Sequence, residues 1–212
     1  MTLYRRGSKG EIVRQIQIAL KQFPDGIFGI MTEEAVREFQ RSKGLAADGI
    51  VGPATLALLL PLRLKKSKRR IDEIIVHCSA TPEGWPYTVE QIRRDHKQQG
   101  WSDIGYHYVI YLDGSIHDGR DVDITGAHCA AGGHNQHSIG ICYIGGLESN
   151  PKVPYAKLKP KDTRTEKQKA SLLSLLLDLK KLYPNAKIYG HHDFDNRKAC
   201  PCFDAKNEYK NL

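Results

Sequence analysis

The sequence predicts an α+β domain, built as a mixed central sheet covered by helices, preceded by a small all-α domain of three helices. Two observations lead to this division. Residues 1–60 contain an internal repeat with helical patterns, whereas the rest of the chain alternates short apolar strands with helices. A run of six basic residues without an acid lies between the two parts, within residues 61–70. We therefore expect a three-helix domain at 1–62, a basic linker at 63–70 and the α+β domain at 71–212.

The charge of the chain is concentrated in the expected linker. The net charge is +8, and residues 61–70 supply six of these charges, while residues 71–212 are balanced. Aromatic residues are not interleaved with the basic run and no base-reading motif follows it, so we read the run as a solvated linker and expect no nucleic-acid partner. We expect the chain to be a monomer.

The N-terminus and the apolar segments indicate where the chain is made. The first residues lack the apolar core of a signal peptide, and no apolar run approaches the thickness of a bilayer. The five cysteines are an odd number without the spacing of a small disulfide scaffold. We therefore expect synthesis in the cytoplasm without a signal peptide, and no membrane insertion.

The N-terminal part contains a repeat with an offset of 23 residues. Residues 25–32, DGIFGIMT, match residues 48–55, DGIVGPAT. In each copy Asp and Gly predict a tight turn, and we expect Thr32 or Thr55 to cap the helix that follows. An earlier helix is expected to open at the capping box of residues 8–11. With no obvious acid–base pair, this module has either a binding role or only a structural one, in which the glycines serve the turns.

The second part is predicted to alternate strands with helices. Thr88 begins a capping box for a helix that ends before Gly100, and Thr165 caps a longer helix that ends at Tyr183. The longer helix carries a stripe formed by Leu172, Leu173, Leu176, Leu179 and Leu182. The expected strands are residues 73–77, 106–111, 115–117, 138–144 and 187–191.

Imidazoles and thiols gather where these strands end. Both are ligands that Zn²⁺ prefers, and a catalytic zinc takes three protein ligands and keeps one position for water. The candidate ligands are His77 and Cys78 after the first strand, His191 and His192 after the last, and Cys200 and Cys202 in the turn beyond it. A closed structural site would need a fourth protein ligand, for which Cys78 or Cys202 is available. The pair Cys200 and Cys202 would crowd an open site, which favours one of them.

Four segments, in order, carry a family resemblance: IIVHCSATP, IRRDHKQQGWSDIGYHYVIYLDG, GAHCAAGGHNQHSIGICYIGG and HHDFDNRKACPCFD. They span nearly all of residues 71–204. This part of the chain resembles the zinc-dependent N-acetylmuramoyl-L-alanine amidases of the phage-lysozyme type, relatives of the peptidoglycan recognition proteins. The resemblance implies Zn²⁺ as cofactor, bound by His77, His191 and Cys200.

The same resemblance implies four further site residues. The family's functional tyrosine falls on Tyr106 and its functional lysine on Lys198, while His128 and Asn135 fall where the family lines its peptide groove. A cation beside the metal can stabilise an oxyanion, and a phenol there can orient water or shuttle a proton. The segment from His191 to Cys200 is one residue longer than the family spacing. This leaves open whether His191 or His192 matches the family's ligand, and whether Lys198 matches its lysine.

Residues 3–60 resemble the peptidoglycan-binding three-helix domain found beside many cell-wall hydrolases. Together the two resemblances imply a peptidoglycan hydrolase that cuts the amide bond between the lactyl group of N-acetylmuramic acid and L-alanine. The alternative is a peptidoglycan-recognition protein that binds without catalysis. The combination with no signal peptide is typical of a phage or prophage endolysin, which acts on the bacterial cell wall after release, whereas an autolysin or a secreted effector is the second possibility.

Overall fold

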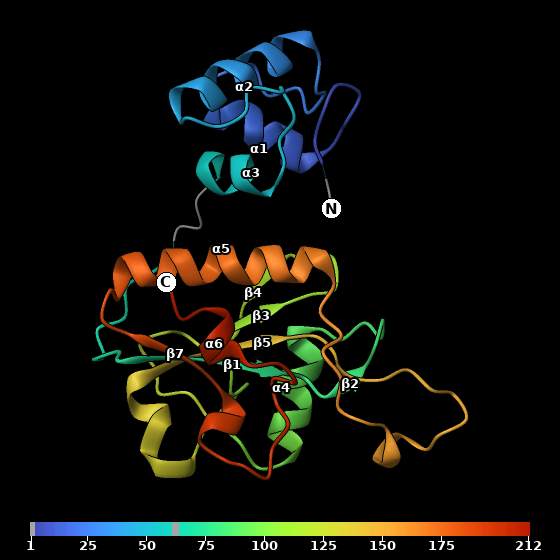
Figure 1. The fold of residues 1–212 in the computed structure, drawn as a ribbon, viewed down its shortest axis with the longest axis vertical. Helices are drawn as coiled ribbons and strands as arrows, with labels where there is room; N and C mark the ends of the chain where they lie inside the picture. The colour runs from blue at the N-terminus through green and yellow to red at the C-terminus, as the bar shows by residue number, and fades with distance from the viewer. Residues whose placement is uncertain (1–2, 61–63) are drawn as a thin grey trace. The chain divides into compact units, whose positions relative to one another are not determined.

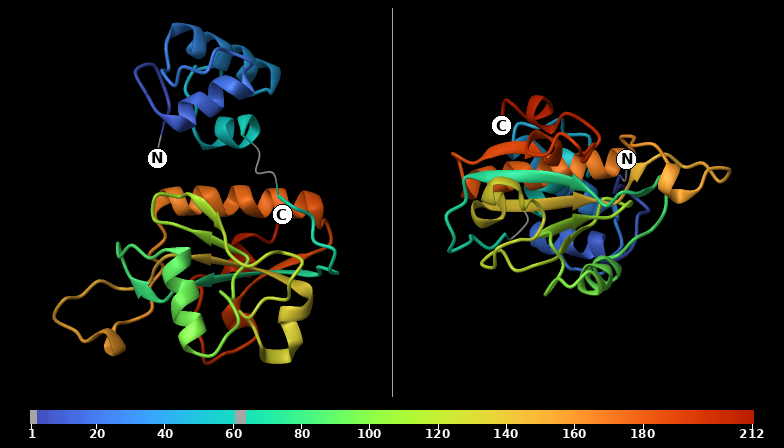
Figure 2. Two further views of the ribbon diagram at one scale, coloured as in Figure 1. Left: turned by 180° about the vertical axis from the view of Figure 1, so that it is seen from behind. Right: turned by 90° about the horizontal axis from the view of Figure 1, so that it is seen from below.

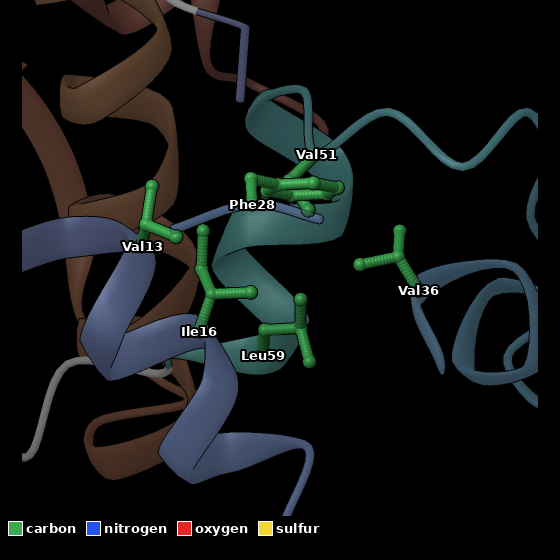
Figure 3. Packing of buried hydrophobic residues seen from close by; sticks show 6 residues of the cluster. All are labelled: Val13, Ile16, Phe28, Val36, Val51 and Leu59. Carbon is green, nitrogen blue, oxygen red and sulfur yellow. The ribbon is translucent and has the colours of Figure 1, made fainter. Parts of the chain in front are cut away.

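The computed structural model describes residues 3–60 and 64–212, and the chain forms two compact units divided between Arg63 and Leu64. The first unit contains three helices, α1 (Glu11–Ala19), α2 (Ile30–Ser42) and α3 (Pro53–Leu59). Its core is formed by Val13, Ile16, Phe28, Val36, Val51 and Leu59 (Figure 3). These side chains come from all three helices and from the two repeated turns, as an amphipathic pattern requires. The prediction of a small all-α domain is therefore confirmed.

The repeated threonines do not cap helices. α2 and α3 begin after Gly29 and Gly52, so Thr32 and Thr55 lie in the first turn of each helix. Both threonines are buried. Their hydroxyl groups accept hydrogen bonds from a glutamine of the preceding helix instead of from the backbone of their own helix. The expected capping role is wrong because the glycine before each helix already occupies the N-cap position.

The second unit is built on a five-stranded sheet with the strand order β4-β3-β5-β1-β7 (Figure 1). The strands are β1 (Glu73–Cys78), β3 (Tyr108–Ile110), β4 (Ile116–Asp118), β5 (Ser138–Tyr143) and β7 (Lys187–Gly190). β1 runs parallel to both β5 and β7, and β3 is parallel to β5 but antiparallel to β4. The mixed sheet confirms the predicted α+β class. A separate parallel pair joins β2 (Thr81–Pro82) and β6 (Gly146–Leu147).

Helices cover the sheet. α5 (Glu166–Leu182) lies along one face and α4 (Val89–Gln98) lies on the other (Figures 1 and 2). Both open with the capping boxes expected at Thr88 and Thr165. The buried leucines of α5 are Leu172, Leu175, Leu176 and Leu179, whereas Leu173, expected in the apolar stripe, is exposed. Shorter turns are η1 (Ala131–His137), η2 (Tyr155–Lys157), η3 (His191–Asp193) and α6 (Ala205–Glu208).

Residues 64–70, expected to be solvated linker, pack on the second unit. The Ser67 backbone N–H donates to the Tyr183 hydroxyl at 2.6 Å, and the buried Ser67 hydroxyl donates to the Val122 carbonyl at 2.7 Å. The Arg69 guanidinium donates to that same carbonyl and to those of Asn135, Gln136 and Ser138. The positive charge at this position is therefore used in part to bind main-chain carbonyls that the sequence pattern does not identify.

No helix in the described ranges, 3–60 and 64–212, has the length and apolar character needed to cross a membrane.

Candidate metal centre and active site

The register of β7 against β1 brings two of the expected ligands together. Val76 lies opposite Gly190, so the residues that follow them, His77 within β1 and His191 just after β7, lie at the same level of the sheet. Their ring centroids are 4.7 Å apart. Parallel strands end at the same edge of a sheet, which is why side chains far apart in sequence meet here.

A loop held from several sides brings Cys200 to the same edge. The His192 backbone N–H donates to the Cys200 carbonyl at 2.8 Å, which closes the loop, and the Tyr143 hydroxyl donates to the Pro201 carbonyl at 2.6 Å. A Cβ atom at Gly190 would lie 2.6 Å from the Pro201 ring, so only glycine leaves room for this packing. The Cys200 thiol then receives the N–H of Cys78 at 3.2 Å.

The donor atoms of His77, His191 and Cys200 all lie within 4.8 Å of one another. The Cys200 Sγ atom is 3.7 Å from Nδ1 of His77. His77 is buried, whereas the other two side chains are partly exposed. Burial, together with the nearby His191 and His107, lowers the pKa of His77 well below its usual value, and a neutral imidazole is the form that binds a metal. This set of two imidazoles and one thiol can hold a metal ion and leave a position open.

The rival ligands face elsewhere. The Cys202 thiol donates to the Gly146 carbonyl at 3.2 Å and lies 3.8 Å from the Cys78 thiol. The contact with Cys200 raises the pKa of Cys78 to about 12, which keeps that thiol protonated. His192 does not belong to the three-donor cluster, and its Nε2 lies 3.9 Å from a carboxylate oxygen of Asp193.

His128 lies behind the first histidine instead of in an open groove. Its Nδ1 atom is 3.0 Å from Nε2 of His77, and its own Nε2 is 3.3 Å from the Ser138 hydroxyl. The ring is confined between Gly126 and Gly140, where a Cβ atom would come within 2.5 Å and 2.4 Å of it. Burial lowers the pKa of His128 well below its usual value. His128 can therefore orient the His77 ring through this contact between the two imidazoles.

Asn135 also has a structural partner. Its Oδ1 atom accepts the backbone N–H groups of His128 and Cys129 at 2.9 and 2.7 Å. The amide oxygen is thus directed into the turn that carries His128. The fold therefore brings together the two residues expected to contact substrate, because Asn135 binds the backbone of His128.

Tyr106 and Lys198 flank the cluster. Tyr106 precedes β3, and its ring lies 5.3 Å from that of His77. Burial, with nearby thiols such as Cys142, raises the pKa of Tyr106 well above its usual value, so its hydroxyl remains a donor. The Lys198 side chain is exposed. The pKa of His191 is lowered first by burial of its own ring and then by the positive charge of Lys198.

The neighbouring cation is engaged by a carboxylate. Arg197 donates to Asp195 through Nε and Nη2, at 2.8 and 3.1 Å. Lys198 has no such side-chain partner within residues 3–60 and 64–212. Of the two adjacent cations, the lysine is therefore the one available to a reacting group.

Sequence reasoning missed the residues that hold the site in place. Ser138, Gly140 and Tyr143 of β5 contact His128 or Pro201. All six residues of β5 are buried, so the strand has no alternation of polar and apolar side chains to reveal which residues face the cluster. The glycine in the middle of an apolar strand was the available signal, because glycine there often marks a close approach.

Comparison with known families gives two matches along the chain. Residues 67–203 match the family model of N-acetylmuramoyl-L-alanine amidase, and residues 9–59 match that of a peptidoglycan binding domain. An endolysin of Klebsiella phage KP32 is 42% identical over 139 residues, which cover 66% of this chain and 85% of that protein.

Solved structures show the same fold. The N-acetylmuramoyl-L-alanine amidase LysC from Clostridium intestinale has a TM-score of 0.52 and 28% identity, covering 66% of this chain and 82% of that one. A Drosophila peptidoglycan recognition protein, a point mutant of PGRP-LB in complex with tracheal cytotoxin, has a TM-score of 0.53 at 23% identity. It covers 72% of this chain and 88% of its own, and at this identity the likeness is one of fold.

Proposed function

Because the chain belongs to the N-acetylmuramoyl-L-alanine amidase family, we propose that His77, His191 and Cys200 hold a zinc ion in its active site. The family reaction is hydrolysis of the amide bond between the lactyl group of N-acetylmuramic acid and L-alanine, and the chain is a peptidoglycan hydrolase. The observation that carries the zinc proposal is the convergence of two imidazoles and one thiol within 4.8 Å.

The donor set fits zinc in number and in kind. Three protein ligands with one open position are typical of catalytic zinc, and imidazole with thiolate is a combination that zinc accepts. Nε2 of His77 faces His128, which leaves Nδ1 toward Cys200 for the metal. The Cys78 N–H donates to the Cys200 sulfur and would stabilise it as a thiolate.

A zinc ion bound here would act as a Lewis acid and lower the pKa of a water molecule to about 7. The protein side chains then have separate tasks. Tyr106 is protonated before the reaction and can donate a hydrogen bond to water or to the substrate carbonyl. Lys198 supplies a positive charge that can stabilise the oxyanion formed during attack on the amide. The leaving nitrogen needs a proton, and we assign this transfer jointly to Tyr106 and Lys198.

We assign His128 and Asn135 to orientation of the site. When a metal occupies Nδ1 of His77, Nε2 of the same ring carries the proton and donates to His128. Asn135 in turn fixes the backbone at His128. This differs from the substrate contact expected from the sequence, and it follows from the burial of the His128 ring.

Residues 1–62 are proposed to bind peptidoglycan and hold the enzyme on its insoluble substrate. The proposal is supported by the match of residues 9–59 to a peptidoglycan binding domain. A fragment of residues 64–212 should then keep activity on soluble muropeptides and lose binding to intact sacculi. Equal binding of sacculi by the fragment and the full chain would remove this role from the first unit.

The metal proposal is tested by zinc analysis of the full chain after dialysis against metal-free buffer. We expect one retained zinc per chain, which Cys200→Ser loses and Cys202→Ser keeps. Release of stem peptides from purified sacculi should follow the zinc content, fall on chelation and return when zinc is added. Zinc retained by the Cys200 variant and lost by the Cys202 variant would overturn the ligand choice.

A further inference from the structure

A second group of side chains with metal-ligand chemistry lies at the other end of β1. The carboxylate of Glu73 and the imidazoles of His134 and His137 have donor atoms within 4.8 Å of one another. One carboxylate oxygen of Glu73 is 2.8 Å from Nδ1 of His134 and 3.5 Å from Nε2 of His137. Two imidazoles and one carboxylate form a common ligand set for divalent transition metals.

This group is separate from the first one. Glu73 precedes His77 by four residues on the same strand, and four residues of strand span about 13 Å. The two groups share no residue. An ion at Glu73 would therefore be a second one, and its existence does not depend on the proposed active site.

The backbone conformation before His134 brings the two histidines together. Gly132 and Gly133 adopt positive φ values of 61° and 76°, which breaks the turn before His134. His134 and His137 then follow in a 3₁₀ turn, in which side chains three residues apart lie one above the other. The register places Glu73 opposite Ser138, so its carboxylate lies beside the end of that turn.

Arg69 and Phe194 hold the turn in place. Arg69 donates to the carbonyls of Asn135 and Gln136, both at 3.3 Å. The His134 ring packs against that of Phe194, with 3.7 Å between the centroids and an angle of 31° between the ring planes. A ligand set fixed by its surroundings loses little freedom when it binds an ion, which favours binding.

The exposure of the three side chains suits an ion that enters from water. The exposed fractions are 14% for Glu73, 21% for His134 and 34% for His137. They are accessible to a small ion yet sheltered enough to limit screening of the charge. Without an ion, the same arrangement is explained by a hydrogen bond between His134 and Glu73. Measurement of bound metal distinguishes an ion site from a hydrogen bond alone.

We propose that Glu73, His134 and His137 bind a second divalent transition-metal cation, of which Zn²⁺ is the representative, more weakly than the proposed active-site set. Three ligands leave the remaining positions to water. The cation links the start of β1 to the η1 turn and, through the contact of His134 with Phe194, to the loop that carries Lys198 and Cys200.

The test uses full-length protein stripped of metal and titrated with zinc chloride, with bound zinc measured by equilibrium dialysis. We expect two equivalents for the parent protein. His134→Ala with His137→Ala should bind one equivalent and keep amidase activity at low zinc, and Cys200→Ser should keep only the weaker equivalent. A cobalt titration should show a thiolate charge-transfer band for the first equivalent alone.

Two further variants control for folding and for nonspecific loss. His137→Ala removes one ligand but leaves the hydrogen bond between His134 and Glu73, so it should fold and still lose the weaker equivalent. His117→Ala removes a histidine on β4, which β3 and β5 separate from β1, and should keep both equivalents. One equivalent in the parent that the double variant keeps, or two equivalents in the double variant, would overturn the proposal, whereas one equivalent that the double variant loses would count against the active-site set instead.

Discussion

Gln17 and Gln40, at equivalent positions of the 23-residue repeat, make the same four hydrogen bonds. Gln17 donates to Asp25, Thr32 and the Ile27 carbonyl and accepts the Gly26 N–H. Gln40 repeats each contact with Asp48, Thr55, Ile50 and Gly49. Each buried amide thus forms hydrogen bonds with polar groups of one turn and with the threonine at the start of the next helix. The repeat in the sequence is therefore, at these positions, a repeat of one hydrogen-bond network.

Replacing either glutamine should destabilise the first unit. Gln40→Ala leaves buried donors and acceptors without partners, and each such group costs about 1–3 kcal/mol. We expect a loss of that size in the free energy of unfolding, with Gln17→Ala similar, measured by urea unfolding of residues 1–63. Gln15→Ala, at an exposed position of α1, is the matched control and should change stability little. Equal effects of Gln15→Ala and Gln17→Ala would refute the network's role.

The first unit should also lose stability in acid. The Ile27 and Ile50 N–H groups, and then Gln17 and Gln40, lower the pKa values of Asp25 and Asp48 below the usual 3.8. A lowered pKa stabilises the folded state above pH 3.8, and this contribution is lost as pH falls below 3.8 toward the folded-state values.

Urea unfolding of residues 1–63 at a series of pH values measures this effect. Asp25→Asn and Asp48→Asn should each flatten the dependence of stability on pH. Glu38→Gln removes an exposed carboxylate of α2 that makes no hydrogen bond or ion pair with any described residue. It should leave the curve unchanged, and curves of the same steepness in all variants would contradict the assignment.

Lys198→Ala should lower turnover without emptying the metal centre. Loss of one oxyanion-stabilising donor typically costs about 10²–10³ in rate, or about 2.7–4 kcal/mol. We expect that decrease in kcat, with zinc content and KM close to those of the parent. Arg197→Ala is the control, because Arg197 is paired with Asp195 and should be dispensable. Near-full activity in the lysine variant with collapse in the arginine variant would show that the roles are reversed.

His128→Ala should weaken zinc binding. Loss of a residue that hydrogen-bonds a metal-binding histidine typically costs about 10–100-fold in metal affinity or activity. Competition with a chelator measures the affinity, and we expect a decrease of that size, with KM for muropeptides unchanged once zinc is saturating. Unchanged zinc affinity with a raised KM would instead assign His128 to substrate binding, as expected from the sequence.

Arg69→Ala should destabilise the second unit. The substitution removes the Arg69 donors from the main-chain carbonyls of Asn135 and Ser138, and it leaves the Val122 carbonyl with the Ser67 hydroxyl as its side-chain donor. Each buried carbonyl left without a partner costs about 1–3 kcal/mol. Arg70→Ala is the control, because Arg70 is exposed and its hydrogen-bond partner is Asp72. Thermal unfolding of residues 64–212 measures both variants. If the two lower Tm equally, residues 64–70 are a linker after all.

Most of the fold follows from local patterns in the sequence. Thr88 and Thr165 open helices because their capping boxes satisfy backbone donors within a few residues. The predicted ligands His77, His191 and Cys200 converge, and the ends of parallel strands explain why. The helix caps at Thr32 and Thr55 were misassigned because a glutamine from another helix takes up their hydroxyl groups.

Other features depend on contacts that no local pattern encodes. Arg69 binds carbonyls more than 50 positions away along the chain, and a cluster of basic residues gives no sign of this. His128 is buried because Gly126 and Gly140 leave space for its ring, which only the packed structure reveals.

The place of β7 in the sheet has a consequence for synthesis of the protein on the ribosome. Among the strands of the described residues, β7 pairs with β1 alone, and the segment after it supplies His191 and Cys200, the latter 123 residues beyond His77. A growing chain folds as its segments emerge, so β1 and β5 can pair before β7 has been translated. The donor set therefore stays incomplete while most of the second unit is being made. The nascent enzyme can assemble its catalytic centre only after the segment carrying Cys200 has left the ribosome.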